Sequence, residues 1–335
     1  MDAAELEKWL IASIDQRYQS HATKNLSDYI FSNYLFHALD PAFVEFAYNF
    51  RREISHYLAD SKHLESLVEY CLDATRRYTY QRNQFINFAK AYDELLNAEY
   101  EDFFNQIKAL LDSVDSADAL TRSFGVVLSR HHERLRLILA SHCVAYQEDG
   151  LKGNPLLQTV PCEEYSAPFQ LRLLNINLAE LTEPVLDIGC GSAGTLVNFL
   201  RSKGYTAFGV DRLAPASPYF FGQDWFDFDY AGRAWGTIIA HQSLSTHFIY
   251  NHLHNSTSAD RYANLYLTII SSLQPSGEFC YAPGLPFFED QVAELGSYSI
   301  TKAAISTNHI LGIGEISYST KIKRERETQN YNANH

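Results

Sequence analysis

The most constraining feature of this sequence is where its glycines and prolines lie. Of the 16 glycines in the 335 residues, only Gly125 precedes Gly150, and of the 10 prolines only Pro41 precedes Pro155. Glycine and proline interrupt helices and mark turns, so their near absence from residues 1–149 favours helices there. The sequence therefore predicts an all-α domain over residues 1–149, followed by a region of a different fold class.

Signals for helix ends agree with this prediction. Asp40 precedes Pro41, which is the order expected of an N-cap and the first helical position. Ser116 is expected to cap a last long helix that ends near Tyr146. Apolar residues after Pro41 recur at helical spacing and share one face: Phe43, Phe46, Ala47 and Phe50.

The second half of the chain has another pattern. Residues 150–183 are expected to form a linker and a short lead-in helix, the helix lying at about 168–181. Over residues 184–325, short apolar runs alternate with helical stretches, which is typical of βαβ units with a parallel sheet. Residues 326–335 are polar and are expected to form a frayed tail.

A glycine turn stands at the start of this α/β region. The segment 184–194 reads PVLDIGCGSAG, which is an apolar strand followed by a turn, and a helix is expected after it. A second strand, 205–210, then ends at the acid Asp211. The glycine spacing also satisfies the dinucleotide pattern GxGxxG. Asp187 favours another ligand, because a carboxylate before the first glycine suits a cationic group better than a pyrophosphate.

The segment 185–194 resembles motif I of the class I S-adenosylmethionine (SAM) dependent methyltransferases. The resemblance covers about residues 184–325 and implies a Rossmann-like, seven-stranded domain that ends in an antiparallel hairpin. It implies that Asp187 lies near the SAM amino group, that Gly189 and Gly191 line the methionine moiety, and that Asp211 binds the ribose. The expected cofactor site also includes the neighbouring residues Cys190 and Arg212.

Further site residues follow from the same resemblance. Gln223 to Trp225 resemble the third-strand segment, in which Asp224 would meet the adenine amino group and Trp225 would flank the ring. Asp227 and Asp229 are close alternatives to Asp224. Tyr165, just upstream of the domain, is expected to cap the cofactor.

Candidate catalytic residues lie after the expected fourth strand, 235–241. Ligands of open α/β sheets bind at the carboxyl ends of the strands, so His241 is placed to contact cofactor or acceptor and to accept a proton during transfer. His247 is a second candidate for the same role. For His241, a hydrogen bond to the cofactor or a packing role stays open. His247 also forms a local cluster with His252 and His254, for which metal binding, an acceptor pocket and an ordinary loop or helix face stay open. Strands six and seven are expected at 298–305 and 315–323.

Composition narrows the function further. The formal net charge of −13 argues against a broad basic surface for nucleic acid. The five cysteines are scattered and form no CxxC pair, so we expect reduced thiols, no metal site and a cytoplasmic protein. No apolar run reaches the length of a membrane span.

These features predict a SAM-dependent methyltransferase that transfers a methyl group to nitrogen, oxygen or sulfur, with a small metabolite favoured as acceptor. The alternatives are a peptide or protein methyltransferase, a SAM-binding or interaction protein without catalysis, and an NAD-linked oxidoreductase. The sequence leaves open whether the chain forms a homo-oligomer and whether the helical domain shapes the acceptor site.

Overall fold

A computed structural model describes residues 2–20, 26, 40–88, 90–146, 157, 160, 165–254, 256–305 and 316–326. The chain divides into two compact units, residues 1–162 and 163–335. The division falls within the segment that we expect to be the linker, 150–183. Cys162 and the expected tail beyond Arg326 lie outside the described residues.

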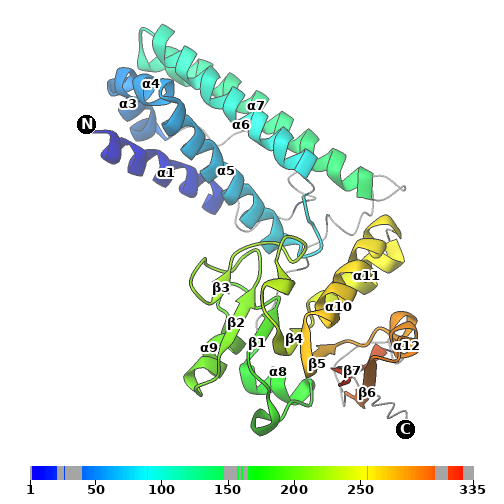
Figure 1. Ribbon diagram of the computed structural model, residues 1–335. Coiled ribbons are helices and arrows are strands. Elements are labelled where there is room, and N and C mark those ends of the chain that lie inside the picture. Colours follow the sequence, from blue (N-terminus) through cyan, green and yellow to red (C-terminus); the bar gives the residue numbers. More distant parts are fainter. Residues whose placement is uncertain are drawn as a thin grey trace, which may run out of the picture. The chain divides into compact units, whose positions relative to one another are not determined.

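In its described part, the first unit is built of helices (Figure 1). Their bounds are α1 (Ala3–Ser20), α3 (Pro41–Asn49), α4 (Arg51–Ala59), α5 (Ser61–Arg82), α6 (Lys90–Ser113) and α7 (Ala117–Tyr146). The helix α6 packs along α7 and also against α4 and α5. The all-α fold predicted from the glycine distribution is confirmed for these residues.

The predicted caps are present. The Asp40 carboxylate accepts a hydrogen bond from the Ala42 N–H at 3.0 Å, and Pro41 is the first residue of α3. Ser116 Oγ accepts from the Ala119 N–H at 3.2 Å, where α7 begins. Each cap satisfies a backbone donor that has no partner inside its helix, which fixes where the helix starts.

The predicted apolar face of α3 packs on the first helix of the chain. Trp9 of α1 stacks on Phe43 and Phe46, with ring centroids 5.1 and 4.2 Å apart. Phe50 extends the same row, 4.7 Å from Phe46. Because aromatic rings bury large apolar areas, this row ties the N-terminal helix to α3.

The second unit is a seven-stranded sheet in the order β3-β2-β1-β4-β5-β7-β6. The strands are β1 (Val185–Ile188), β2 (Ala207–Val210), β3 (Phe220–Phe221), β4 (Trp235–His241), β5 (Leu273–Ala282), β6 (Tyr298–Ala304) and β7 (Tyr318–Arg324). Strands β1 to β5 pair in parallel, whereas β7 pairs antiparallel with both β5 and β6. The predicted closing hairpin is therefore present.

Helices cover both faces of this sheet. They are α8 (Ala167–Leu173), α9 (Thr195–Ser202), α10 (Leu244–His254), α11 (Ser256–Ser271) and α12 (Pro286–Glu294), with short 3₁₀ turns η2 (Leu178–Glu180) and η3 (Tyr230–Gly232). Successive strand residues point to opposite faces. Leu186 and Ile188 accordingly join the core beneath α10 and α11, while Val185 joins the core beneath α8 and α9.

The third strand differs from its prediction. We expect it at residues 223–225, but the strand is only Phe220–Phe221, and residues 223–225 lie in the turn that follows it. Phe220 pairs with Gly209 and Phe221 with Val210, so contacts with β2 decide the register. A two-residue strand carries too short a pattern to be located from sequence alone.

Candidate functional site

The first element of the site is the turn between β1 and α9. Gly189, Gly191 and Gly194 have φ angles of +80°, +71° and +56°, a region that favours glycine. At Gly189 a Cβ atom would also lie 2.4 Å from the Cβ of Ser243. Ser243 Oγ donates to the Ile188 carbonyl at 2.6 Å, which fixes the segment after β4 against the end of β1. The glycines are therefore required both by backbone conformation and by close approach.

This turn lies where the direction of strand order reverses. From β1 the chain proceeds to β2 and β3 on one side, and then to β4 and β5 on the other. In open α/β sheets such a reversal leaves a crevice at the carboxyl ends of the strands, where ligands bind. The residues that end β1, β2 and β4 are therefore the ones that a ligand at this edge would contact.

Asp211 joins two of these strand ends. Its Oδ2 accepts from the Gly191 N–H at 3.2 Å, and its Oδ1 accepts from the Leu213 N–H at 2.8 Å. Burial raises the pKa of Asp211, while the hydrogen bonds from Leu213 and Gly191 and the nearby Arg212 guanidinium act in the opposite direction. The carboxylate is thus held in one orientation beside the glycine turn.

Asp187 is the most unusual group of the site. Its side chain is 3% exposed, and burial together with the nearby Asp211 carboxylate raises its pKa to about 7. No hydrogen bond from the described residues reaches it to offset the burial. A buried carboxylate without a partner is costly, and a bound cation would remove that cost.

Glu289 provides an internal comparison, because it is a second buried carboxylate. It is 0% exposed, yet its Oε1 accepts from the Leu285 N–H at 2.8 Å and its Oε2 lies 2.8 Å from Lys302 Nζ. Three hydroxyl groups also donate to it, those of Tyr281, Tyr318 and Thr320. Burial acts to raise its pKa, but these bonds outweigh burial and hold the pKa below its ordinary value. Glu289 is satisfied by the protein itself, whereas Asp187 has no hydrogen-bond donor within the described part of the chain.

The loop after β5 is part of this packed network. Tyr281 is fully buried, and Phe287 and Phe288 pack against Phe248 at 5.3 and 5.4 Å between ring centroids. These contacts make the segment a packed loop.

Trp225 and Asp224 lie in the turn after β3. The indole carbon Cζ2 of Trp225 is 3.2 Å from the position that a Cβ on Gly189 would take, so the ring borders the glycine turn. Asp224 is half-buried, and its Oδ1 accepts from the Phe226 N–H at 3.0 Å. Of its alternatives, Asp227 is exposed, and Asp229 is exposed and caps η3. The burial pattern favours Asp224 among the three.

His241 ends β4, on the same face of the sheet as α8. Two aromatic rings lie edge-on to it: Tyr165, with centroids 5.1 Å apart, and Phe169 at 6.0 Å. Its Nε2 is buried and has no hydrogen-bond partner among the described residues. Burial lowers the pKa of His241 to about 4, so the pKa near neutrality that suits a general base is not found. The sequence does not indicate Phe169, because nothing local marks it as a neighbour of His241.

His247 lies deeper, on α10. Its ring meets Trp225 edge-on at 4.9 Å, and its Nδ1 is 3.4 Å from the Tyr262 hydroxyl. Burial, with a contribution from Arg212, lowers its pKa to about 3. Both histidines are therefore neutral at physiological pH.

The structure also shows the surroundings of Cys190 and of the histidines after His247. The side chain of Cys190 packs in the core beneath α8 and α9, with its Sγ against Gly209, so only its main chain lies in the turn. His252 stacks on Phe287 and His254 lies against Tyr250, each apart from the contacts of His247. Within the described ranges, no three His, Cys, Asp or Glu side chains gather as a metal-binding group.

The strand order, the single antiparallel strand β7 and the glycine turn at the strand reversal together decide the fold of residues 163–335. It is the class I SAM-dependent methyltransferase fold. The sequence matches no family model and no curated protein. None of the helices that the structure describes is long and apolar enough to cross a bilayer.

Solved structures with a similar fold include three methyltransferases. The plantazolicin methyltransferase BpumL, in complex with a desmethylPZN analog and SAH, is 12% identical over 48% of this chain and 82% of its own, with a TM-score of 0.31. The N-methyltransferase NodS from Bradyrhizobium japonicum WM9 is 13% identical over 48% and 94%, with a TM-score of 0.33. The glycopeptide N-methyltransferase MtfA, complexed with SAM, is 15% identical over 50% and 97%, with a TM-score of 0.32. Because these TM-scores are low, the fold is assigned from the strand order and register and not from any of these matches.

Proposed function

We propose that the protein is a SAM-dependent methyltransferase and that SAM binds at the carboxyl edge of β1, β2 and β4. The observation that carries this proposal is Asp187, a buried carboxylate beside the glycine turn that receives no hydrogen bond from the residues that the structure describes. The ammonium group of SAM supplies the positive charge that such a site lacks. A pyrophosphate would instead bring further negative charge next to Asp187, which argues against NAD.

The other proposed contacts with SAM are assigned from the position of each residue along the carboxyl edge of the sheet. Asp211, oriented by the Gly191 and Leu213 N–H groups, is proposed to accept hydrogen bonds from the ribose hydroxyls. Asp224 and Trp225 are proposed to meet the adenine, the first at its amino group and the second at its ring. Gly189 and Gly191 would let the methionine chain approach the main chain closely.

Methyl transfer would proceed by direct displacement. A lone pair on the acceptor nitrogen, oxygen or sulfur forms the new bond to the methyl carbon while the bond from that carbon to the sulfonium breaks, leaving S-adenosylhomocysteine (SAH). SAM is already activated, so the protein chiefly has to align the two groups and exclude water. An acceptor proton, where there is one, passes to solvent or to a nearby base.

His241 is proposed to contact the acceptor, in preference to His247. Its Nε2 has no partner among the described residues, whereas the ring of His247 is occupied by Trp225 and Tyr262. With its pKa lowered to about 4, His241 is a weak base. A role in orienting the acceptor therefore fits it better than carrying the proton through the reaction. Tyr165 and Phe169 would complete an aromatic wall around this position.

A small metabolite is the proposed acceptor, and a radiolabel assay tests this. The full chain is incubated with methyl-labelled SAM and sets of small amines, alcohols and thiols, and label in the acceptor is counted. Transfer that is lost in Asp187→Asn supports the proposal. Tight SAM binding without transfer to small molecules, peptides or proteins would instead assign the chain as a SAM-binding protein without catalysis.

A further inference from the structure

A cavity of about 140 Å³ lies inside the helical unit, between α1, α5, α6 and α7. Most of its wall is apolar, and Phe103, Leu128 and Ile138 are among the residues that form it. Well-packed interiors leave few voids larger than a water molecule, so a space of this size is a candidate ligand site. An apolar cavity of about 150 Å³ in another protein binds benzene, which limits a ligand here to a single ring with small substituents.

The polar edge of this cavity is formed by three hydroxyl groups that bond to one another, which we call the hydroxyl cluster. They belong to Tyr18 of α1, Thr75 of α5 and Tyr100 of α6, and all three residues line the cavity. The oxygen–oxygen distances are 2.6 to 2.9 Å. Burial raises the pKa of Tyr18 to about 12 and that of Tyr100 well above its ordinary value, so both phenols keep their protons.

The hydrogen-bonding capacity of the hydroxyl cluster selects the polar group that a ligand can carry. A hydroxyl group has one donor and two acceptor positions. The mutual bonds use the donors, because each hydroxyl donates to the next, and each oxygen keeps one acceptor position. The main-chain carbonyl of Cys71, 3.5 Å from the Tyr18 oxygen, competes for the same donors. A ligand that donates a hydrogen bond can therefore join the cluster without breaking it, whereas a ligand that only accepts one cannot.

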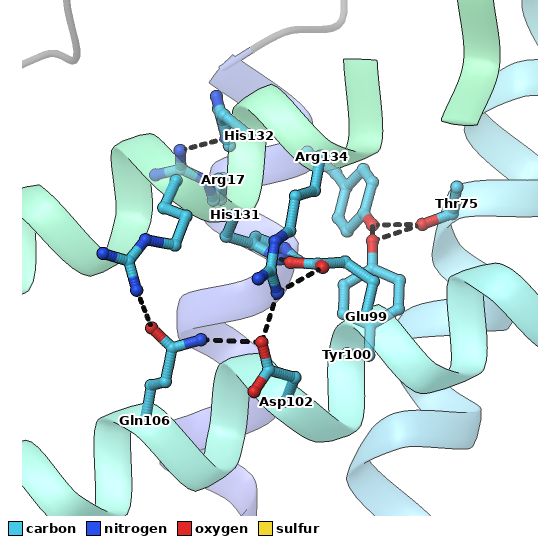
Figure 2. A network of polar contacts seen from close by, with 11 residues as sticks. Arg17, Thr75, Glu99, Tyr100, Asp102, Gln106, His131, His132 and Arg134 are labelled. Atoms are coloured by element: carbon cyan, nitrogen blue, oxygen red, sulfur yellow. Dashed lines mark hydrogen bonds and ion pairs between the residues drawn. The ribbon is translucent and has the colours of Figure 1, made fainter. Parts of the chain in front are cut away.

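The charged groups near the cavity are bonded within the protein, as Figure 2 shows. Arg17 Nη2 lies 2.5 Å from His132 Nε2. The buried carboxylate of Glu99 bonds to His131 Nδ1 at 2.8 Å and to Arg134 Nη1 at 3.1 Å. A neutral ligand leaves these pairs as they are, whereas a charged ligand would lose its hydration and compete with them.

We propose that the helical unit binds a small neutral phenol, which is a single ring with one hydroxyl group and about seven to nine non-hydrogen atoms. The ring fills the apolar part of the cavity between Phe103, Leu128 and Ile138. The ligand hydroxyl donates to an oxygen of the hydroxyl cluster. This site goes beyond the proposed methyl transfer and depends on contacts of the helical unit alone, so the two proposals are tested separately.

The test uses the full chain and 4-fluorophenol as probe, followed by ¹⁹F NMR at pH 7, where a phenol is neutral. We expect saturable binding at one site with a Kd of about 0.1–1 mM, the scale for a ligand of this size. The larger 6-fluoro-2-naphthol has a second fused ring and should bind at least about tenfold more weakly, because the cavity has room for one ring.

A second probe, 4-fluorotoluene, isolates the contribution of the hydrogen bond. It carries a methyl group in place of the hydroxyl and is otherwise the same size as 4-fluorophenol. The triple variant Tyr18→Phe, Thr75→Val and Tyr100→Phe keeps the shape of the cavity and removes the three oxygens. It should bind 4-fluorophenol about 5- to 100-fold more weakly, because the ligand hydroxyl is then buried without an acceptor. Its affinity for 4-fluorotoluene should be undiminished.

Thr121→Val serves as the matched control, since Thr121 is exposed on α7 and does not line the cavity. It should bind both probes as the unaltered chain does, whereas Leu128→Trp should abolish binding of both by filling the cavity. Far-UV circular dichroism checks that each variant is folded, and the comparison of phenol with naphthol needs no variant.

Three results would each overturn the proposal. The first is absence of saturable 4-fluorophenol binding, and the second is binding of the naphthol as tight as that of the phenol. The third is a ratio of 4-fluorophenol to 4-fluorotoluene affinity that is the same in the triple variant and the unaltered chain.

Discussion

The unsatisfied carboxylate of Asp187 makes SAM binding depend on pH in a defined way. With a pKa of about 7 in the free protein, Asp187 is about half protonated at neutral pH. An ammonium group at this position favours the charged form and draws the pKa back toward its ordinary value near 4. SAM must therefore displace a proton from Asp187 at any pH below about 7.

The size of the effect follows from these two values. Bringing the pKa from about 7 to about 4 corresponds to at most about 4 kcal/mol of coupling between ligand and carboxylate. SAM affinity should then fall about fiftyfold as the pH is lowered from 7 to 5, a range in which the ammonium of SAM stays charged. Binding should release about 0.9 proton at pH 6 and about 0.5 at pH 7.

Isothermal titration calorimetry measures both quantities. Affinity is recorded from pH 5 to 7, and proton release is obtained by repeating each titration in buffers of different ionisation enthalpy. Asp187→Asn should abolish the pH dependence and the proton release, and it should weaken binding at pH 7 by roughly 1.5–3 kcal/mol. Asp260→Asn is the matched control, because Asp260 is exposed on α11 of the same unit.

The folding stability of the protein should also depend on the protonation of Asp187. A pKa raised above that of the unfolded chain stabilises the fold at low pH, and this contribution is lost as the pH rises from about 4 through about 7. The melting temperature of Asp187→Asn, relative to the unaltered chain, should therefore rise as the pH is raised from 5 to 7.5 in the absence of SAM. A melting-temperature difference that does not change with pH would refute this account of Asp187. So would a SAM affinity that does not change with pH, together with SAM binding that releases no proton.

Four other substitutions test the remaining parts of the site. Asp211→Ala should weaken SAM binding by roughly 1–3 kcal/mol in calorimetry, and unchanged affinity would exclude the ribose contact. Gly189→Ala should lower stability by roughly 1–3 kcal/mol, because its Cβ would lie 2.4 Å from that of Ser243; a normal melting temperature would mean that the turn can relax. Glu289→Ala should cost roughly 3–5 kcal/mol of unfolding free energy by leaving Lys302 and the hydroxyl donors without their acceptor, with denaturant titration as the measure and an undiminished midpoint as the contrary result. His241→Ala should keep its SAM affinity while slowing methyl transfer by up to about 10²-fold in single-turnover kinetics, the scale for a misplaced acceptor, and wild-type rates would remove His241 from the mechanism.

Much of the fold was predictable because it depends on local patterns. The glycine turn identified β1 and its neighbour β2, and β4 was expected at the bounds found, 235–241, since a run of apolar residues ends there at His241. Caps at Asp40 and Ser116 are also local, which is why the starts of α3 and α7 were expected correctly.

The rest depends on residues that are distant in sequence. The low pKa of His241 results from burial that includes the Tyr165 and Phe169 rings, which come from the region of α8. The hydroxyl groups of Tyr18, Thr75 and Tyr100 hydrogen-bond to one another across three helices. No local pattern of the sequence predicts these bonds. Whether a buried acid has hydrogen-bond donors, as Glu289 has, or has none among the described residues, as at Asp187, likewise becomes known only from the tertiary contacts.

The central claim, that the second unit binds SAM, is tested most directly by equilibrium dialysis of methyl-labelled SAM against the full chain at pH 7. We predict saturation at about one SAM per chain, displacement by SAH, and no displacement by NAD, because NAD would bring a pyrophosphate against Asp187. Absence of saturable SAM binding, or displacement of SAM by NAD at similar concentrations, would contradict the account.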